Sequence, residues 1–352
     1  MYPALICNER KLRENVRVLL EETKKRGIEM TVVVKGVSAW KEFCEILVSE
    51  GVKSIADSRV INLKKIKSLE VEKILLRIPM LSEVKEVITH TDISFNSEIF
   101  VIRELNKEAK KQNKVHKIVL MIDIGDLREG ILPNRLEDYI NEIMKLENIE
   151  FLGIATNITC YGGVLPSKEN LGILVESKKI IKEKIGRDIE IVSGGNSSSF
   201  LFLIKDLLPL GINNLRFGEV LLLGRETETG NFVDILNNHI FKLETEIIEI
   251  KEKPSVPIGK IGVDGFGNIP NFKDKGIRKR AIVGIGRQDI NIGTYTPIDE
   301  KIEVLGASSD HMIIDITDSE NEYKIGDIIE FNINYEGLLS LSTSEYVYKK
   351  IV

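Results

Sequence analysis

The first two-thirds of the chain alternates short apolar runs with amphipathic stretches. The apolar runs are rich in Ile, Val and Leu and do not alternate with polar residues, which is typical of strands buried on both faces of a parallel sheet. Eight such runs begin near residues 31, 53, 73, 92, 117, 151, 189 and 215. Several stretches between them place apolar residues on one helical face and Lys and Glu on the other, as at 10–26, 97–112 and 168–185. The pattern predicts eight strand–helix units.

Eight parallel strands with intervening helices favour a closed (β/α)8 barrel of the TIM type over residues 1–233. The alternative is an open, doubly wound sheet, which would become the better prediction if one of the eight strands were misassigned. After residue 233 the helical periodicity stops. Short apolar runs such as KLETEIIEI, RAIVGIG and DIIEFNI follow, separated by turn residues. They predict a second, mostly β domain over residues 234–352.

Composition narrows the class of protein. The net charge is −5, with both signs interspersed, so a nucleic-acid-binding protein is not expected. The three cysteines, Cys7, Cys44 and Cys160, are odd in number and show no spacing pattern, which fits a reducing, cytoplasmic compartment. No apolar stretch is long enough to span a membrane, and the amino terminus does not resemble a secretion signal.

In a parallel barrel the active site forms at the carboxyl ends of the strands. Polar residues that end the predicted strands include Lys35, Arg77, Asn96, Asp123, Arg128, Asn157 and Arg216. Lys35 follows three valines, so its amine is expected at a desolvated barrel mouth. An amine kept neutral by burial can attack an aldehyde. The alternative is a lysine that merely ends a strand and extends to solvent.

The run SGGNSSS, residues 193–199, precedes a stretch that looks helical. Glycine amides, serine hydroxyls and a helix amino terminus together form the pattern of a phosphate cradle, although Gly/Ser loops without a ligand are common. The last two barrel strands often carry phosphate sites, and the last strand lies beside the first in a closed barrel. Pyridoxal phosphate, a phosphorylated aldehyde, would satisfy both this loop and Lys35.

Arg216, in the eighth strand, fits the same cofactor. Its guanidinium stays protonated, so against the pyridine nitrogen it would keep that nitrogen unprotonated. The cofactor would then be a weaker electron sink, which favours rapid reprotonation of the substrate. An ordinary barrel salt bridge is the alternative role for Arg216.

These residues resemble the fold-type III pyridoxal-phosphate family, which includes alanine racemase. The runs VVVKG, MIDIGDLREG, SGGNSSS, NLRFGEVLLLG and GASSDHMIIDITD follow in the family's order. The chain is more closely similar to the ornithine racemase branch. That likeness is carried by ADSRVINLKKIKSL, LLRIPMLSEV, NITCYGG, KEKPSVPIG and KGIRKRAI, among other runs, and extends over essentially the full length.

The resemblance implies roles for individual residues. Lys35 corresponds to the lysine that binds the cofactor covalently and is one of two catalytic bases. Arg128 corresponds to an arginine near the cofactor's phenolic oxygen and the substrate carboxylate, and Arg216 to the partner of the pyridine nitrogen. The implied phosphate site comprises Asn196, Ser197, Gly218, Glu219 and Tyr335. Family members are homodimers in which the β domain of one subunit completes the active site of the other. The implied substrate is a small amino acid, ornithine or a related basic one.

The chain departs from alanine racemase at three positions. Arg287 stands where that enzyme has its tyrosine base, Asn157 where it has a histidine near the cofactor, and Met121 where it has a carbamylated lysine. The second base therefore remains open among Cys160, Tyr161, Asp289, Asp310 and His311. We favour His311, because an imidazole suits proton transfer near neutrality, with Cys160 as the alternative.

A basic substrate needs an acidic contact for its terminal amine. The loop acids Glu129, Asp126, Asp289 and Asp310 are the candidates, and any of them can instead be an ordinary solvated charge. Four other functions remain open: an alanine or broad-specificity racemase, a fold-type III decarboxylase or aldolase, a non-catalytic carrier of pyridoxal phosphate, and a barrel for another phosphate ligand. The carrier is disfavoured because small barrel proteins of that kind lack a β domain.

Overall fold

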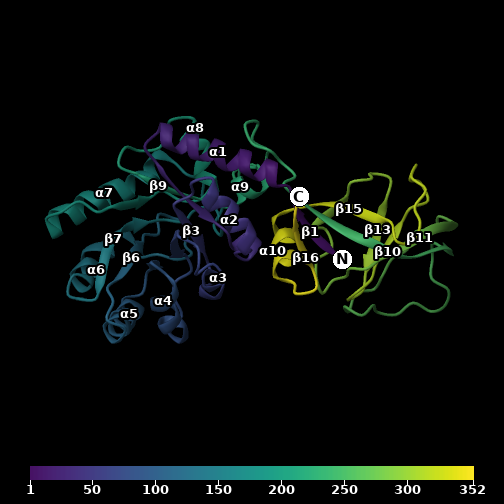
Figure 1. Ribbon diagram of the computed structural model, residues 1–352, viewed down its shortest axis with the longest axis horizontal. Helices are drawn as coiled ribbons and strands as arrows, with labels where there is room; N and C mark the ends of the chain where they lie inside the picture. The colour runs from purple at the N-terminus through teal and green to yellow at the C-terminus, as the bar shows by residue number, and fades with distance from the viewer. The chain divides into compact units, whose positions relative to one another are not determined.

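The computed structural model describes residues 1–352, which divide into two compact units (Figure 1). One comprises Arg10–Asn238, and the other combines Met1–Glu9 with His239–Val352. The expected division of the chain into 1–233 and 234–352 is therefore corrected at both ends. The second unit begins at His239, and it also takes up the first nine residues of the chain.

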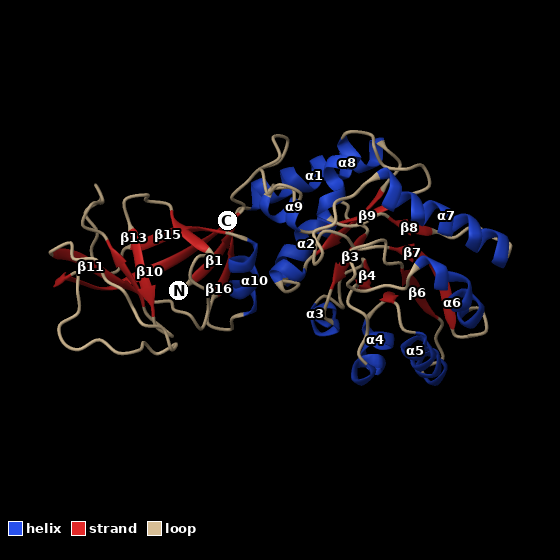
Figure 2. Ribbon diagram, turned by 180° about the vertical axis from the view of Figure 1, so that it is seen from behind, coloured by secondary structure: helices blue, strands red, loops and turns tan.

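The larger unit is a closed barrel of eight parallel strands, as the apolar runs predicted. The open sheet is excluded because the first and last strands pair, with Thr31 opposite Arg216. Figure 2 shows the strands in red inside a ring of blue helices. The strands are β2 (Glu29–Val33), β3 (Ser54–Asp57), β4 (Glu72–Leu75), β5 (Ile93–Asn96), β6 (His116–Met121), β7 (Ile149–Ala155), β8 (Ile191–Ser193) and β9 (Asn214–Phe217).

Helices follow the strands around the barrel. The α-helices are α1 (Glu9–Lys25), α2 (Lys41–Ser49), α3 (Val60–Lys65), α4 (Val84–His90), α5 (Ile99–Lys111), α6 (Leu136–Ile143), α7 (Lys168–Ile185), α8 (Phe200–Ile204) and α9 (Glu219–Leu223). Short 3-10 turns lie at Lys35–Val37, Leu81–Glu83, Pro133–Arg135 and Ser197–Ser199. Helix α7 shows local signals clearly: Ser167 and Asn170 form a reciprocal capping box, and Gly186 ends the helix in the left-handed conformation. None of the helices has the length and apolar character needed to cross a lipid bilayer.

The barrel interior is filled by side chains. A buried cluster draws Val33, Ala56, Phe95 and Met121, among others, from strands β2–β7. Because successive strand residues face opposite ways, Phe95 points inward while its neighbours face the helices. This packed floor separates the amino ends of the strands from their carboxyl ends, where polar residues gather.

The second unit is a mostly antiparallel sheet, as the short apolar runs after residue 233 predicted. Its strands are β1 (Ala4–Cys7), β10 (Phe241–Pro254), β11 (Ile277–Val283), β12 (Tyr295–Pro297), β13 (Glu303–Ala307), β14 (Met312–Asp315), β15 (Ile328–Ile333) and β16 (Tyr348–Ile351), with one helix, α10 (Tyr335–Thr343). Strand β1 pairs with β10 and β16, and its four residues are all buried. These pairings are the physical reason why the amino terminus joins this sheet rather than the barrel.

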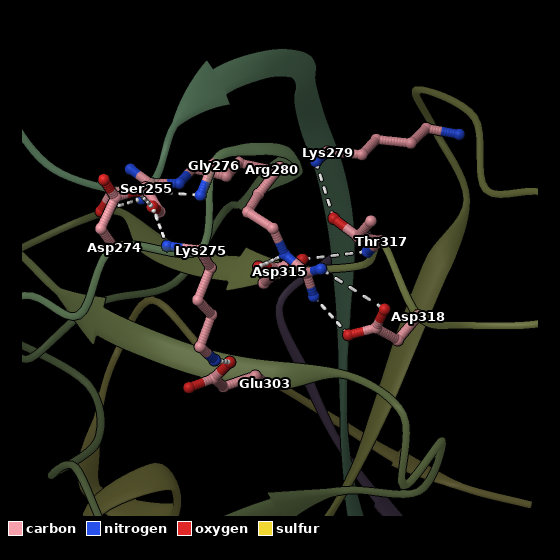
Figure 3. A network of polar contacts seen from close by, with 11 residues as sticks. Ser255, Asp274, Lys275, Gly276, Lys279, Arg280, Glu303, Asp315, Thr317 and Asp318 are labelled. Carbon is pink, nitrogen blue, oxygen red and sulfur yellow. Dashed lines mark hydrogen bonds and ion pairs between the residues drawn. The ribbon is translucent and has the colours of Figure 1, made fainter.

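Figure 3 shows polar contacts that close a long loop between β10 and β11. The hydroxyl of Ser255 donates to Asp274 at 3.2 Å and accepts the amide of Lys275 at 2.7 Å, which pinches the loop at its base. After the loop, Arg278 of β11 pairs with Asp315 at 2.7 Å and also with Asp318. The runs KEKPSVPIG and KGIRKRAI, which support the family resemblance, thus meet in one structural feature of this sheet.

Candidate active site

A cavity of about 370 Å³ opens at the carboxyl ends of the barrel strands. It is lined by Lys35, Ser58, Leu76, Arg77, Ile78, Phe95, Met121, Arg128, Glu129, Asn157 and Arg216. Five predicted site residues therefore come together here from separate strands and loops: Lys35, Arg128, Glu129, Asn157 and Arg216. The lining holds four cationic side chains and one carboxylate, so the cavity suits an anionic ligand.

Lys35 follows β2 and begins the 3-10 turn Lys35–Val37. Its side chain is half-buried and faces the cavity, and its ammonium makes neither a hydrogen bond nor an ion pair. Lysine ammonium groups at strand ends normally reach solvent or a carboxylate. A lysine held in a cavity without a partner is instead available to a ligand.

Arg216 of β9 is buried, and its guanidinium is held by neutral acceptors. It donates to the Ser193 hydroxyl at 2.6 Å and to the Thr156 carbonyl at 2.5 Å, and it lies 5.2 Å from the centre of the Phe95 ring. Burial lowers the pKa of Arg216 to about 10. The alternative of an ordinary barrel salt bridge is wrong, because no carboxylate pairs with this arginine.

Arg128 and Glu129 are neighbours that pair with each other. Both Nε and Nη2 of Arg128 donate to the Glu129 carboxylate, the latter at 2.6 Å, and this pairing raises the pKa of Arg128 above its ordinary value. The turn that presents them is fixed by Asp126. Its buried carboxylate accepts the amides of Tyr161 and Gly162 at 3.1 and 3.0 Å. Asp126 therefore holds these two loops together, and a contact between it and the substrate amine stays a prediction.

Hydrogen bonds within the chain fix the 193–199 loop at the ends of β8 and β9. Asn196 accepts the Ser198 amide at 2.9 Å, and the Ser197 hydroxyl accepts the amides of Gly218 and Val220 at 3.3 and 3.2 Å. The buried hydroxyl of Ser198 has no hydrogen-bond partner. Donors left unsatisfied in a buried loop are costly unless a ligand completes them.

Two residues limit which groups can form the predicted phosphate site. They are Gly195 in this loop and Glu219 at the start of α9. Gly195 has φ +111°, and a Cβ there would lie 2.8 Å from the Ser199 hydroxyl, so the position requires glycine. Glu219 pairs with Arg225 at 2.8 Å, so its backbone rather than its side chain is available to an anion at the start of α9.

Asn157, Asn196 and Cys160 form a small polar cluster at the end of β7. The Asn196 amide donates to Asn157 Oδ1 at 3.1 Å and to Cys160 Sγ at 3.2 Å. Asn157 Nδ2 is buried without a partner, while Cys160 itself is exposed. The cluster connects the cavity wall to a thiol at its rim, whereas Tyr161 lies with its side chain in solvent.

The remaining predicted residues belong to the second unit. Asp289 is buried and accepts the Ser344 hydroxyl at 2.6 Å, whereas Asp310 and His311 are exposed on the turn before β14. Tyr335 begins α10. Their part in the active site stays a prediction.

Sequence reasoning missed part of the cavity wall. Ser58 follows β3, and Leu76 and Ile78 flank Arg77 after β4. Arg77 was recognised as a strand-end residue without a role; it pairs with Glu83 and lines the cavity. The signal that identified Lys35, a polar residue ending an apolar run, would also have identified Ser58.

Comparison with known proteins decides the family. Residues 7–226 match the family "Alanine racemase, N-terminal domain". The chain belongs to the alanine racemase family. An ornithine racemase from Acetoanaerobium sticklandii is 50% identical over 353 residues, covering 100% of both chains. A lysine racemase from Thermotoga maritima is 40% identical over 351 residues, covering 99% of this chain and 98% of that protein.

Solved structures of alanine racemases share the fold. The alanine racemase of Clostridium difficile 630 superposes with a TM-score of 0.77 at 23% identity, covering 100% of this chain and 96% of that one. The alanine racemase of Bartonella henselae, solved with covalently bound pyridoxal phosphate, gives 0.74 at 18% identity and covers both chains completely. The barrel followed by a β domain is thus the architecture of this racemase family.

Proposed function

We propose that the protein is an amino-acid racemase that uses pyridoxal phosphate and acts on ornithine or a closely related diamino acid. The observation that carries the proposal is the pair formed by Lys35 and Arg216. Both are cations without a carboxylate partner, and they line one cavity from strands that adjoin at the seam of the barrel. The 50% identity to an ornithine racemase supports the substrate.

The residues present fit the cofactor. Lys35 would bind its aldehyde, and Arg216 would lie against its pyridine nitrogen. The phosphate would take the amide of Glu219 at the start of α9, while Asn196, Ser197 and the Gly218 amide, which donates to the Ser197 hydroxyl, would shape the loop. The buried Ser198 hydroxyl, which has no partner within the chain, is a donor that a phosphate oxygen would satisfy. When bound, the cofactor supplies the electron sink that makes the substrate α-proton acidic.

The chain's own groups then move that proton. Inversion requires a base on each face of the α-carbon. The amine of Lys35 is the base on one face. For the other face we retain His311, with Cys160 as the alternative. Cys160 is supported by its hydrogen bond to Asn196, which also binds the cavity residue Asn157. Asp289 is less suited, because Ser344 already occupies its carboxylate.

Substrate choice follows from the Arg128–Glu129 pair. A diamino acid carries a carboxylate and a distal ammonium, so it can exchange with this pair: its carboxylate takes Arg128 and its ammonium takes Glu129. One ion pair of the resting site is thereby replaced by two with the substrate. A neutral amino acid would take Arg128 but leave Glu129 unpaired, which is costly in a partly buried site. Asp310 remains a second candidate contact for the ammonium.

The decisive test combines chirality and isotope exchange. Incubating the holoenzyme with a panel of L-amino acids in D₂O should give D-ornithine carrying deuterium at the α-carbon, at unchanged chemical composition. Decarboxylation or cleavage would instead change the substrate's composition, and a carrier would give no turnover. The variant Lys35→Ala should lose the visible absorbance of the lysine-bound cofactor. Its racemase activity should fall by about 10³-fold. Retention of both would refute the assignment.

We further infer a cytoplasmic homodimer in which the β unit of one subunit completes the other's site. A subunit-mixing experiment tests this arrangement. Hybrids of Lys35→Ala and His311→Asn subunits should regain activity, since one of the two composite sites then has an intact barrel and an intact β unit. Hybrids as inactive as the parents, formed from subunits that demonstrably mix, would contradict shared sites.

A further inference from the structure

The turn that carries Lys35 adopts an unusual backbone conformation. After the 3-10 turn, Ser38 and Ala39 both have positive φ, at 52° and 47°. Left-handed conformations are unfavourable for residues with a Cβ, and two in succession persist only where the surroundings impose them. The structure must therefore contain a feature that anchors this turn.

Lys65, the last residue of α3, supplies the anchor. Its ammonium donates to the Ser38 carbonyl at 2.9 Å, to the Ser38 hydroxyl at 3.0 Å and to Asn62 Oδ1 at 2.8 Å. All three ammonium hydrogens are thereby used. The Ser38 hydroxyl also donates to Asn62 Oδ1 at 3.2 Å. A single lysine thus binds both polar groups of the first strained residue.

Asn62 links this anchor to a buried carboxylate. Its amide donates to both oxygens of Asp57 at 3.1 and 3.2 Å, and the Arg59 amide donates to Asp57 at 2.8 Å. Asp57 ends β3, the strand paired with β2, and is fully buried without an ion pair of its own. Burial raises the pKa of Asp57 to about 6, although the charges of Lys65 and Lys35 act to lower it.

The charges around the cavity suggest a role for the buried Asp57 carboxylate. Arg77 pairs with Glu83 and Arg128 with Glu129, so these arginines are compensated locally. Lys35 has no such partner. The Asp57 carboxylate ends the neighbouring strand at the same level as Lys35, because Ala56 lies opposite Val33 and the Val34 amide donates to the Ala56 carbonyl at 2.8 Å. Its negative charge therefore offsets part of the positive field in which the Lys35 ammonium sits.

We propose that Lys65, Asn62 and Asp57 form a positioning cluster for Lys35, in which Lys65 fixes the turn and Asp57 supplies the compensating charge. The proposal rests on the proposed function only for the role of Lys35 as the cofactor-binding lysine. Its tests measure the stability of the turn and the protonation of the Lys35 amine directly. None of the three residues lines the cavity, so they act through Lys35 rather than on a ligand.

Hydrogen exchange tests the anchor in the full-length protein without cofactor. Lys65→Met should accelerate exchange of the amides of residues 36–40 by about tenfold or more, with the rest of the barrel unchanged. The matched control is Lys64→Met on the same helix, which removes an exposed pair with Glu86 and should leave the turn unaltered. Unchanged exchange of the turn in Lys65→Met, or equal acceleration throughout the barrel, would overturn the role of Lys65.

Labelling of the amine tests the charge. The pH dependence of Lys35 acetylation by acetic anhydride, read by peptide mass spectrometry, measures the pKa of the amine in the cofactor-free protein. In Asp57→Asn the acetylation of Lys35 should begin at lower pH than in the wild-type protein, because a compensating anion is lost. Asp92→Asn, which alters an exposed carboxylate at the start of β5, should leave it unchanged. An identical Lys35 pKa in Asp57→Asn and the wild-type protein would refute the charge role.

The two levels of inference can fail separately. Wild-type protein that never binds pyridoxal phosphate at Lys35 would defeat the proposed function, whatever the turn does. Wild-type protein that binds it, together with variants that keep wild-type exchange and wild-type amine pKa, would defeat only the positioning cluster.

Discussion

Replacement of Glu129 by Gln should change which amino acids the enzyme prefers. In the resting site the Glu129 carboxylate pairs with Arg128, and both line the cavity. A hydrogen bond to a charged group contributes about 1.5–3 kcal/mol. The Glu129 side chain is 23% exposed and that of Arg128 38%, so solvent screening favours the lower part of this range. Loss of the carboxylate should therefore lower kcat/KM for ornithine by about 10- to 50-fold.

Norvaline gives the comparison that isolates the distal amine, because it has the same chain length without the ammonium. Racemisation of both substrates would be followed by chiral chromatography for wild-type enzyme, Glu129→Gln and the control Glu142→Gln. Glu142 pairs with Lys145 at 2.6 Å on the outside of the barrel, so its variant should behave as wild type. Norvaline should turn over unchanged or faster in Glu129→Gln, since Arg128 is freed. An equal loss for both substrates would show that Glu129 only shapes the site and does not read the ammonium.

Three further predictions concern stability and cofactor binding. Burial lowers the pKa of His116 from 6.5 to about 4, so the folded state loses up to about 3 kcal/mol as pH falls from 6.5 to 4. His116→Gln, which keeps a hydrogen-bonding partner for Ser94, should remove that loss when urea midpoints at pH 7.5 and 4.5 are compared; an unchanged difference would contradict it. Gly195→Ala should cost about 1–3 kcal/mol in thermal unfolding and weaken cofactor binding, because of its positive φ and its approach to Ser199. Arg216→Met should leave the stability of the cofactor-free protein nearly unchanged, because relief of about 3 kcal/mol of desolvation offsets the two lost hydrogen bonds. The same variant should weaken cofactor binding. A large loss of stability in the cofactor-free protein would contradict this reasoning.

The barrel was predictable because its strands are buried on both faces and therefore read as unbroken apolar runs. The same runs identify their own carboxyl ends, which is how Lys35 and Arg216 were found. No strand was predicted at residues 4–7, which were simply included in the barrel range, because a run of four apolar residues carries no information about its partner strands. Its place is set by pairing with β10 and β16, hundreds of residues away in the chain.

Contacts that depend on backbone conformation could not be predicted from the sequence. Asp126 looked like a free loop acid, but its carboxylate binds backbone amides of residues 161–164, which no pattern in either loop announces. Lys65 ends a helix as many lysines do, and only the left-handed turn at Ser38 gives its ammonium a specific target. In both cases at least one partner atom belongs to the backbone of a turn, and residue identities do not reveal such a contact.

The distribution of charge around the cavity connects the fold to its ligand. Arg77 and Arg128 each have a carboxylate partner, whereas Lys35 and Arg216 have none. These two lie on the first and last strands, whose pairing closes the barrel. Apart from the longer-range compensation of Lys35 that we propose for Asp57, the protein therefore holds positive charge without a direct ion-pair partner at the seam where the barrel closes, and this charge carries an electrostatic cost until an anionic ligand binds. A ligand that reacts with the amine and carries an anionic group relieves that cost only in the closed barrel, so its binding should raise the unfolding temperature in proportion to the logarithm of its concentration.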